Sequence, residues 1–180
     1  MNKYIKIILL SVALTQGVVP SYADFWTGVA VGAAASSTSC PKIDTCFTPS
    51  QDCIKPLIER LGKAKKSIYV QAYSFTNHDI AMALIEAKGR GVNVQVYVDK
   101  KRIKEKHSII YKLIEAKIPV IVQKSKNLAH NKIMIIDDEL VITGSFNWTN
   151  NALKNEENLN FIKSKELVQV YLHNWKEIVK

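Results

Sequence analysis

The stretch from His130 to Asn147, HNKIMIIDDELVITGSFN, decides the fold that we expect for this chain. Two apolar runs, 133–136 and 140–142, flank the acidic tripeptide DDE, a pattern typical of two strands joined by a tight turn. Side chains two apart on a strand share a face, so His130 and Lys132 should point the same way. The stretch therefore predicts a β-hairpin that presents an imidazole beside an ammonium.

Within this stretch, the pattern H-x-K-x4-D-x6-G-S-x-N specifies His130, Lys132, Asp137, Gly144, Ser145 and Asn147. A neutral imidazole, a fixed cation and neutral hydrogen-bond donors suit attack on a phosphate ester without a metal ion. His130 would become a phosphohistidine, while Lys132 and Asn147 stabilise charge on the equatorial oxygens. A structural histidine beside a surface lysine is the alternative, which a pattern with so many specified residues disfavours.

Two further residues of the pattern are expected to have structural roles. Gly144 has no side chain, so a ligand or another backbone segment can approach closely just before Ser145. Asp137 stands in the turn, where short acidic side chains cap backbone groups, and we expect it to take no part in chemistry. We therefore treat Asp137 and Gly144 as structural residues and Ser145 as a substrate-binding residue.

With its continuation through Thr149 and the pair Glu157-Asn158, the stretch resembles the HKD motif of the phospholipase D superfamily. From Cys46 onward the layout is similar to the small bacterial endonucleases of that superfamily, which carry one motif per chain. The resemblance implies a phospholipase D/nuclease-like fold with a nucleophile, phosphate ligands and a carboxylate that orients the nucleophile. In this chain the nucleophile would be His130 and the phosphate ligands would be Lys132 and Asn147. The orienting carboxylate would be Glu157, with Glu156 alongside.

Strands and helices alternate outside this stretch, which indicates an α/β protein. Apolar runs predict strands at 45–47, 67–74, 92–98, 120–123 and 159–163. Helical periodicity predicts a helix capped by Ser50 and further helices at 77–88, 106–117 and 165–179. With the antiparallel hairpin included, we expect a mixed β-sheet flanked by helices on both faces.

The N-terminus has the features of a secretory signal, with Lys3 and Lys6 before a mostly apolar run and a small-x-small cleavage site at 21–23. We expect a signal peptide over 1–23, a flexible leader over 24–43 and the catalytic domain over 44–180. The protein would then be exported and periplasmic. The alternatives are an uncleaved anchor and a peripheral membrane contact of the leader.

Three cysteines, Cys40, Cys46 and Cys53, precede the first predicted helix. An exported protein enters an oxidising compartment, so a disulfide is expected. A bridge between Cys46 and Cys53 would tie the first strand to the start of the helix, and Cys40 would stay free or pair with a partner. A zinc site is the alternative, but no histidine lies nearby and the spacings differ from those of zinc modules.

The chain is basic, with 25 Lys and Arg against 16 Asp and Glu and a formal net charge of +9. This charge favours an anionic partner, either nucleic acid or anionic lipid. Lys124 and Lys126 precede His130, and a second basic stretch, 100–106, follows a predicted strand. Such residues either contact phosphates or form solvated loops. Among the aromatic residues, Trp148 is the candidate for stacking on a base.

The sequence contains a single copy of the motif, and this has a consequence for the quaternary structure that we expect. In-line displacement places the attacking and leaving oxygens on opposite sides of phosphorus, so one imidazole cannot easily attack and also protonate the leaving group. We therefore expect a two-fold homodimer in which His130 of each subunit faces one shared active site.

The predicted function is a phosphodiesterase that needs neither metal nor cofactor, an endonuclease that hydrolyses DNA, with RNA as a second candidate substrate, and has little sequence specificity. A phospholipase D acting on glycerophospholipids is the alternative. A nucleic-acid-binding module with a dead site is the third possibility, which the complete set of predicted catalytic residues disfavours.

Overall fold

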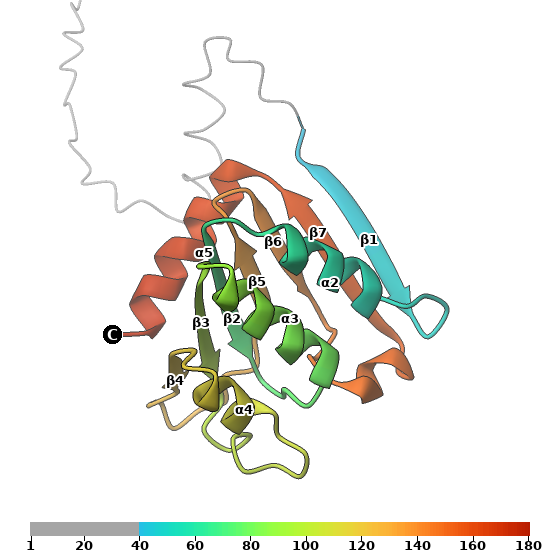
Figure 1. Ribbon diagram of the computed structural model, residues 1–180. Coiled ribbons are helices and arrows are strands. Elements are labelled where there is room, and N and C mark those ends of the chain that lie inside the picture. Colours follow the sequence, from blue (N-terminus) through green and yellow to red (C-terminus); the bar gives the residue numbers. More distant parts are fainter. Residues whose placement is uncertain (1–39) are drawn as a thin grey trace, which may run out of the picture. The chain divides into compact units, whose positions relative to one another are not determined.

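A computed structural model of the chain describes residues 40–180 (Figure 1). Within this range the strands are β1 (Lys42–Thr48), β2 (Ser67–Ala72), β3 (Asn93–Val98), β4 (Val120–Val122), β5 (Lys132–Ile136), β6 (Leu140–Gly144) and β7 (Glu157–Lys163). The helices are α2 (Ile54–Lys63), α3 (His78–Gly89), α4 (Ile110–Glu115) and α5 (Lys165–Ile178), with a 3-10 turn, η1 (Asn150–Leu153), before β7. Each strand and helix predicted for this part of the chain is present.

The described strands form one seven-stranded sheet with the order β1-β7-β6-β5-β2-β3-β4. Strands β2, β3 and β4 run parallel to one another. From β1 through β7, β6 and β5 to β2, each neighbouring pair is antiparallel. The sheet is therefore mixed, as the sequence predicts.

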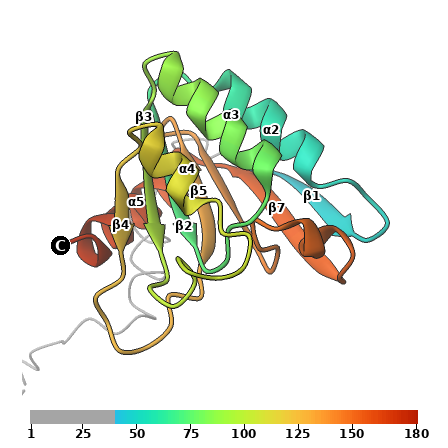
Figure 2. The same ribbon diagram turned by 60° about the horizontal axis from the view of Figure 1, so that its bottom comes forward.

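Helices cover both faces of this sheet, with α2, α3 and α4 on one face and α5 on the other (Figures 1 and 2). Strand β5 contributes to the core on each side because successive side chains of a strand point to opposite faces. Met134 and Ile136 pack beneath the first group of helices. Ile133 and Ile135 pack beneath α5. The hairpin strand that carries Lys132 is thus held from two sides.

Two predicted helix starts are wrong. Helix α2 is not capped by Ser50, because Asp52 lies closer to its first turn and its Oδ1 accepts from Ile54 N at 3.0 Å and Lys55 N at 3.3 Å. The helix predicted over 106–117 begins only at Ile110, since the preceding residues form turns and His107 has a φ of 66°, which an α-helix excludes.

The predicted signal peptide, and the predicted leader as far as residue 39, lie outside the described residues. Strand β1 begins at Lys42, so residues 42 and 43, which the prediction placed in the leader, pair with β7. Across residues 40–180, no helix has both the length and the apolar character that a membrane span requires.

The predicted disulfide between Cys46 and Cys53 is confirmed, with an S–S distance of 2.05 Å. It joins β1 to Cys53, the residue directly before α2. Both half-cystines are buried, whereas Cys40 is exposed and free. The bridge therefore fastens the edge strand β1 to the helix that follows it.

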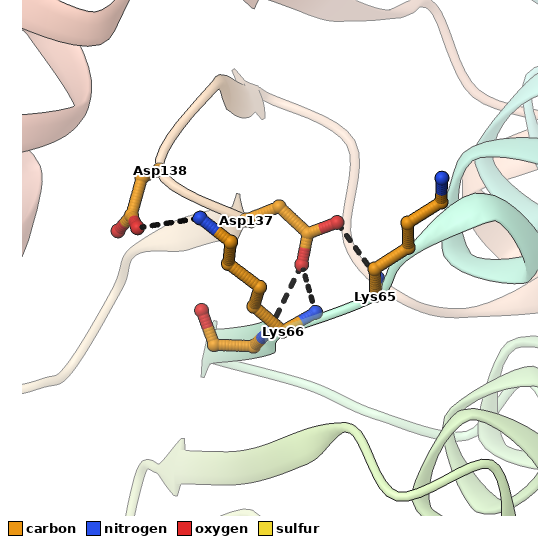
Figure 3. Close-up of polar contacts among 5 residues, drawn as sticks. Lys65, Lys66, Asp137 and Asp138 are labelled. Carbon is orange, nitrogen blue, oxygen red and sulfur yellow. Dashed lines mark hydrogen bonds and ion pairs between the residues drawn. The ribbon is translucent and has the colours of Figure 1, made fainter.

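Asp137 fixes the hairpin turn against the start of β2 (Figure 3). Its carboxylate accepts three backbone N–H groups, from Lys65 and Lys66 at 2.7 Å each and from Ser67 at 2.9 Å. Burial alone would raise the pKa of this carboxyl, but the three N–H groups and the charge of Lys66 outweigh it and hold the pKa below its usual value. Asp137 and Asp138 have φ values of 54° and 57°, the left-handed backbone that Asp and Asn tolerate better than most other residues with a side chain.

Replacing Asp137 by Asn should lower the free energy of unfolding by about 2 kcal/mol at neutral pH, because an amide cannot accept all three N–H groups. The depressed pKa means that this carboxylate stabilises the fold above its unfolded pKa of about 4, and that the contribution disappears as the pH falls through the folded pKa. Urea unfolding of both proteins should therefore show a difference that shrinks in acid.

The matched control is Asp138→Asn, in the same turn and with the same backbone conformation. The Asp138 carboxylate has only an exposed ion pair with Lys66 at 3.9 Å, so this variant should lose less than about 0.5 kcal/mol. Equal losses in the two variants would contradict the role of Asp137, as would a loss that persists unchanged at low pH.

Candidate active site

The register of the sheet gathers most of the motif at one end of the strands. Strands β2 and β6 end there, and β5 and β7 begin there, so that Ala72 pairs with Lys132. An open pocket of about 490 Å³ lies at this end, lined by His130, Asn131, Lys132, Ile133, Thr143, Gly144, Ser145, Asn147 and Glu157. Five of the six spaced motif residues line it, and Asp137, at the far end of β5, does not.

His130 and Lys132 point the same way, as the hairpin pattern predicts. Lys132 Nζ lies 3.1 Å from His130 Nδ1 and donates to the His130 carbonyl oxygen at 2.6 Å. The ring of Tyr73 packs against the His130 ring, with centroids 4.4 Å apart, and its centroid lies 4.9 Å from Lys132 Nζ. Asn131 hydrogen bonds instead to Gln71, whose Oε1 accepts from Asn131 Nδ2 at 2.6 Å.

Lys132 is a buried cation, with 6% of its surface exposed. No ion pair among residues 40–180 includes it. Burial lowers the pKa of the Lys132 ammonium below its usual value, while the negative charge of Glu157 acts in the opposite direction. Since a buried charge without an ion partner is costly, this position suits the binding of an anion.

The segment after β6 brings neutral polar groups to the pocket. A Cβ at Gly144 would lie 2.9 Å from the carbonyl carbon of Asn158, so the close approach predicted for this glycine is that of another backbone segment. Ser145 N donates to Asn158 O at 3.1 Å, and Ser145 Oγ accepts from Asn158 N at 3.1 Å. Asn147 lines the pocket, and its Oδ1 is buried with no hydrogen-bond partner in the described part of the chain, so Nδ2 is the amide atom that would donate to an anion.

Glu157, and not the exposed Glu156, lines the pocket. Its Oε1 accepts from Asn155 Nδ2 at 3.1 Å. Within residues 40–180 no hydrogen bond joins this carboxylate to His130, and the Nδ1 atom of His130 faces Lys132. The orienting role of Glu157 therefore stays a prediction, made for a carboxylate that already lies in the same pocket.

Trp148 cannot stack on a base, contrary to the prediction. Its ring is 0% exposed, and its Nε1 donates to the Gln71 carbonyl oxygen at 3.1 Å, so the side chain belongs to the core. Lys124 and Lys126 are exposed on the loop that leads to His130, and neither lines the pocket. Lys124 Nζ donates to the Lys180 carbonyl oxygen at 3.0 Å.

The sequence pattern did not identify Asp99, whose carboxylate holds the backbone next to the site. Asp99 is fully buried directly after β3. Its Oδ2 accepts from Ala129 N and its Oδ1 from Lys101 N, each at 2.8 Å. It thereby fixes the backbone just before His130. Its place at the carboxyl end of a parallel strand, where α/β proteins commonly build their sites, is the signal that could have identified it.

Comparisons with known proteins identify the family to which this chain belongs. Residues 57–179 match the family model described as cardiolipin synthase, PLD-like domain. The chain is 39% identical over 191 aligned positions to a phospholipase D of Rickettsia felis, covering 97% of this chain and 94% of the relative. A phospholipase D of Rickettsia conorii is 45% identical over 141 residues, 78% of this chain and 70% of the relative. Among solved structures, Nuc from Salmonella typhimurium, a phospholipase D family member, superposes with a TM-score of 0.73 at 32% identity, covering 77% of this chain and 93% of Nuc.

Replacing Glu157 by Gln should slow hydrolysis of a small chromogenic phosphodiester by roughly a hundredfold if the carboxylate orients His130. The alkaline limb of the pH–rate profile should also move to lower pH. Glu157 raises the pKa of Lys132, so without its charge the ammonium would lose its proton at a lower pH.

Glu156→Gln serves as the matched control, because it removes the same charge from an exposed neighbour. Its rate and its alkaline limb should equal those of the wild type. A limb that moves to higher pH in the Glu157 variant, or two variants that behave alike, would refute the assignment.

Proposed function

Because this chain belongs to the family of phospholipase D-like domains, it is a phosphodiesterase, and we propose that its substrate is nucleic acid. In this proposal it is an exported endonuclease that cleaves DNA or RNA with little sequence specificity and without a metal ion, through a phosphohistidine at His130. The resemblance to small single-motif bacterial nucleases and the structural similarity to Nuc support this substrate, as does the net charge of +9.

The observation that carries the proposal is the buried ammonium of Lys132, in contact with an imidazole at an open pocket whose lining residues are mostly of polar types. Ile133 is the one aliphatic side chain among the residues that line this pocket, apart from the methyl group of Thr143. Acyl chains would need a broad apolar groove beside the motif. A polynucleotide carries its anionic diesters on a polar backbone, and such a backbone fits these lining residues better than acyl chains do.

Catalysis would proceed in two displacements. The Nδ1 atom of His130 lies against Lys132, so Nε2 is the nitrogen placed to attack, once the ring carries its proton on Nδ1. A bond forms from Nε2 to phosphorus while the bond to the leaving oxygen breaks, and a second imidazole protonates that oxygen. Water then attacks phosphorus, gives a proton to the second imidazole, and the P–N bond breaks. Lys132 and Asn147 would stabilise the equatorial oxygens in both steps.

The second imidazole would come from another copy of the chain. His130 is the one histidine among the residues that line the pocket. The other histidines of the described range, His78, His107 and His173, are exposed elsewhere. We therefore place His130 of a two-fold-related copy across the phosphorus, so that one active site is shared by a homodimer.

A phospholipase is the second candidate, since the relatives from Rickettsia bear that name. One structural observation favours it. Leu128, two residues before His130, is 51% exposed, and Lys124 and Lys126 lie on the same loop. An exposed apolar side chain among lysines is a feature of surfaces that touch anionic membranes.

A substrate panel tests the proposal. Wild type and His130→Ala are incubated with chelator and with plasmid, a single-stranded oligonucleotide, or vesicles that contain phosphatidylcholine and cardiolipin. We expect the wild type to cleave the nucleic acids, and His130→Ala to be slower by about a thousandfold or more, because the nucleophile is gone. Release of lipid headgroups alone would establish the second candidate, and loss of nuclease activity in chelator would exclude the metal-free mechanism.

A mixed dimer tests the shared site. Co-expression of wild type and His130→Ala with two different tags yields a heterodimer that carries one His130. If each reaction needs both imidazoles, this heterodimer should be nearly as slow as the His130→Ala homodimer. If each chain works alone, it should retain about half of the wild-type rate. Full activity in a purified monomer would also rule out the shared site.

A further inference from the structure

Tyr73 connects the active site to the basic loop between β3 and α4. One side of this connection is the His130 ring, which packs against Tyr73. The other is Arg102, whose guanidinium carbon lies 4.4 Å from the Tyr73 ring centroid and whose Nη2 donates to the Tyr73 hydroxyl. A single aromatic ring therefore separates the imidazole of the motif from a second cation.

Arg102 is held in place and is still accessible. Its Nη1 lies 3.5 Å from a carboxylate oxygen of Glu105, whose other oxygen accepts from Ser74 Oγ at 2.6 Å. The Arg102 side chain is 39% exposed. A guanidinium carries five N–H donors in a rigid fork, so these contacts leave donors without a partner among residues 40–180.

The loop that carries Arg102 is anchored to the segment that carries His130. Asp99 accepts from the backbone of Lys101 on one side and of Ala129 on the other, at 2.8 Å each. Lys100 Nζ donates to the Ser125 carbonyl oxygen at 2.7 Å, which ties the same two segments a second time. The position of Arg102 relative to His130 is thus set by the fold, as a preformed binding site requires.

We propose that Arg102, supported by Tyr73, is a second phosphate subsite that binds the phosphate next to the scissile one in a polynucleotide. This inference rests on the proposed function and names the feature that selects its substrate. A guanidinium fork matches phosphate oxygens with two parallel hydrogen bonds. Phosphatidylcholine has a single phosphodiester, so it would leave Arg102 without a phosphate partner. A nucleic acid strand has a neighbouring phosphate on each side of the scissile one and fills both positions.

The test compares Arg102→Gln with wild type on two substrates, a single-stranded oligonucleotide and bis(4-nitrophenyl) phosphate, which has one phosphate. For the oligonucleotide, KM should rise about tenfold with little change in kcat, since the lost contact is a ground-state contact to the phosphate backbone. The slope of log(1/KM) against log[salt] should become shallower by about 0.7, the value for one phosphate contact on a single strand. Hydrolysis of the small diester should stay within about twofold, because that substrate does not reach the subsite.

Two further variants provide the controls. Lys88→Gln removes the same charge from the last turn of α3, which leads into β3 at the end of the sheet away from the pocket. It should leave the salt slope unchanged. Arg102→Lys keeps the charge and should keep the slope of the wild type, with a KM between those of wild type and Arg102→Gln, because an ammonium cannot form the bidentate contact.

Each of the remaining outcomes would contradict the inference for a different reason. An equal loss on both substrates would mean that Arg102 acts through Tyr73 on the position of His130 and binds no phosphate. If Arg102→Gln and Lys88→Gln changed KM and the salt slope equally, Arg102 would contribute only as part of the general surface charge. A wild type that cleaves vesicles but no oligonucleotide would instead refute the proposed function, a result that does not depend on any Arg102 variant.

Discussion

A positive charge buried beside an imidazole is the constraint on which the rest of the structure depends. Removing an ammonium from water costs several kcal/mol unless an anion compensates it, and in its own chain Lys132 contacts the ring and the carbonyl oxygen of His130. The fold tolerates this because the strand that begins at Lys132 is packed between two cores. A phosphodiester would place a negative charge in contact with Lys132, so the residue whose burial costs stability also favours the binding of an anion.

The residues that determine to which face of the sheet Lys132 points take no part in the reaction themselves. A shift of one residue in the register of β5 would turn Lys132 to the opposite face of the sheet. Asp137 opposes such a shift, because its three backbone contacts hold the far end of the same strand against the start of β2. Gly144 lets β7 approach, and β7 brings Glu157 to the pocket. The motif therefore contains residues that hold the hairpin as well as residues that face the phosphate.

Local patterns in the sequence were enough to predict the structural features that depend on residues close together in the chain. The hairpin, the shared face of His130 and Lys132, and the disulfide between Cys46 and Cys53 follow from alternation, turn chemistry and spacing. Features that depend on distant contacts were not predictable. Trp148 follows the motif closely enough to suggest a role at the surface, yet its ring fills the core, and its N–H finds a carbonyl oxygen 77 positions away. The stack of Arg102 on Tyr73 likewise joins two loops that follow different strands.

In the proposed dimer, identical chains must supply two unlike imidazoles, and both roles need a proton on Nδ1. The nucleophile attacks through an unprotonated Nε2 and so carries its proton on Nδ1, whereas the general acid carries a proton on each ring nitrogen. In either role Nδ1 cannot accept from Lys132, whose Nζ lies 3.1 Å away. An anion that draws Lys132 away from Nδ1 would remove this conflict, and Glu157, which lines the same pocket, is a carboxylate that could accept from a protonated Nδ1. Binding of the phosphate would then both neutralise the buried charge and give the nearer ring the tautomer that a nucleophile needs.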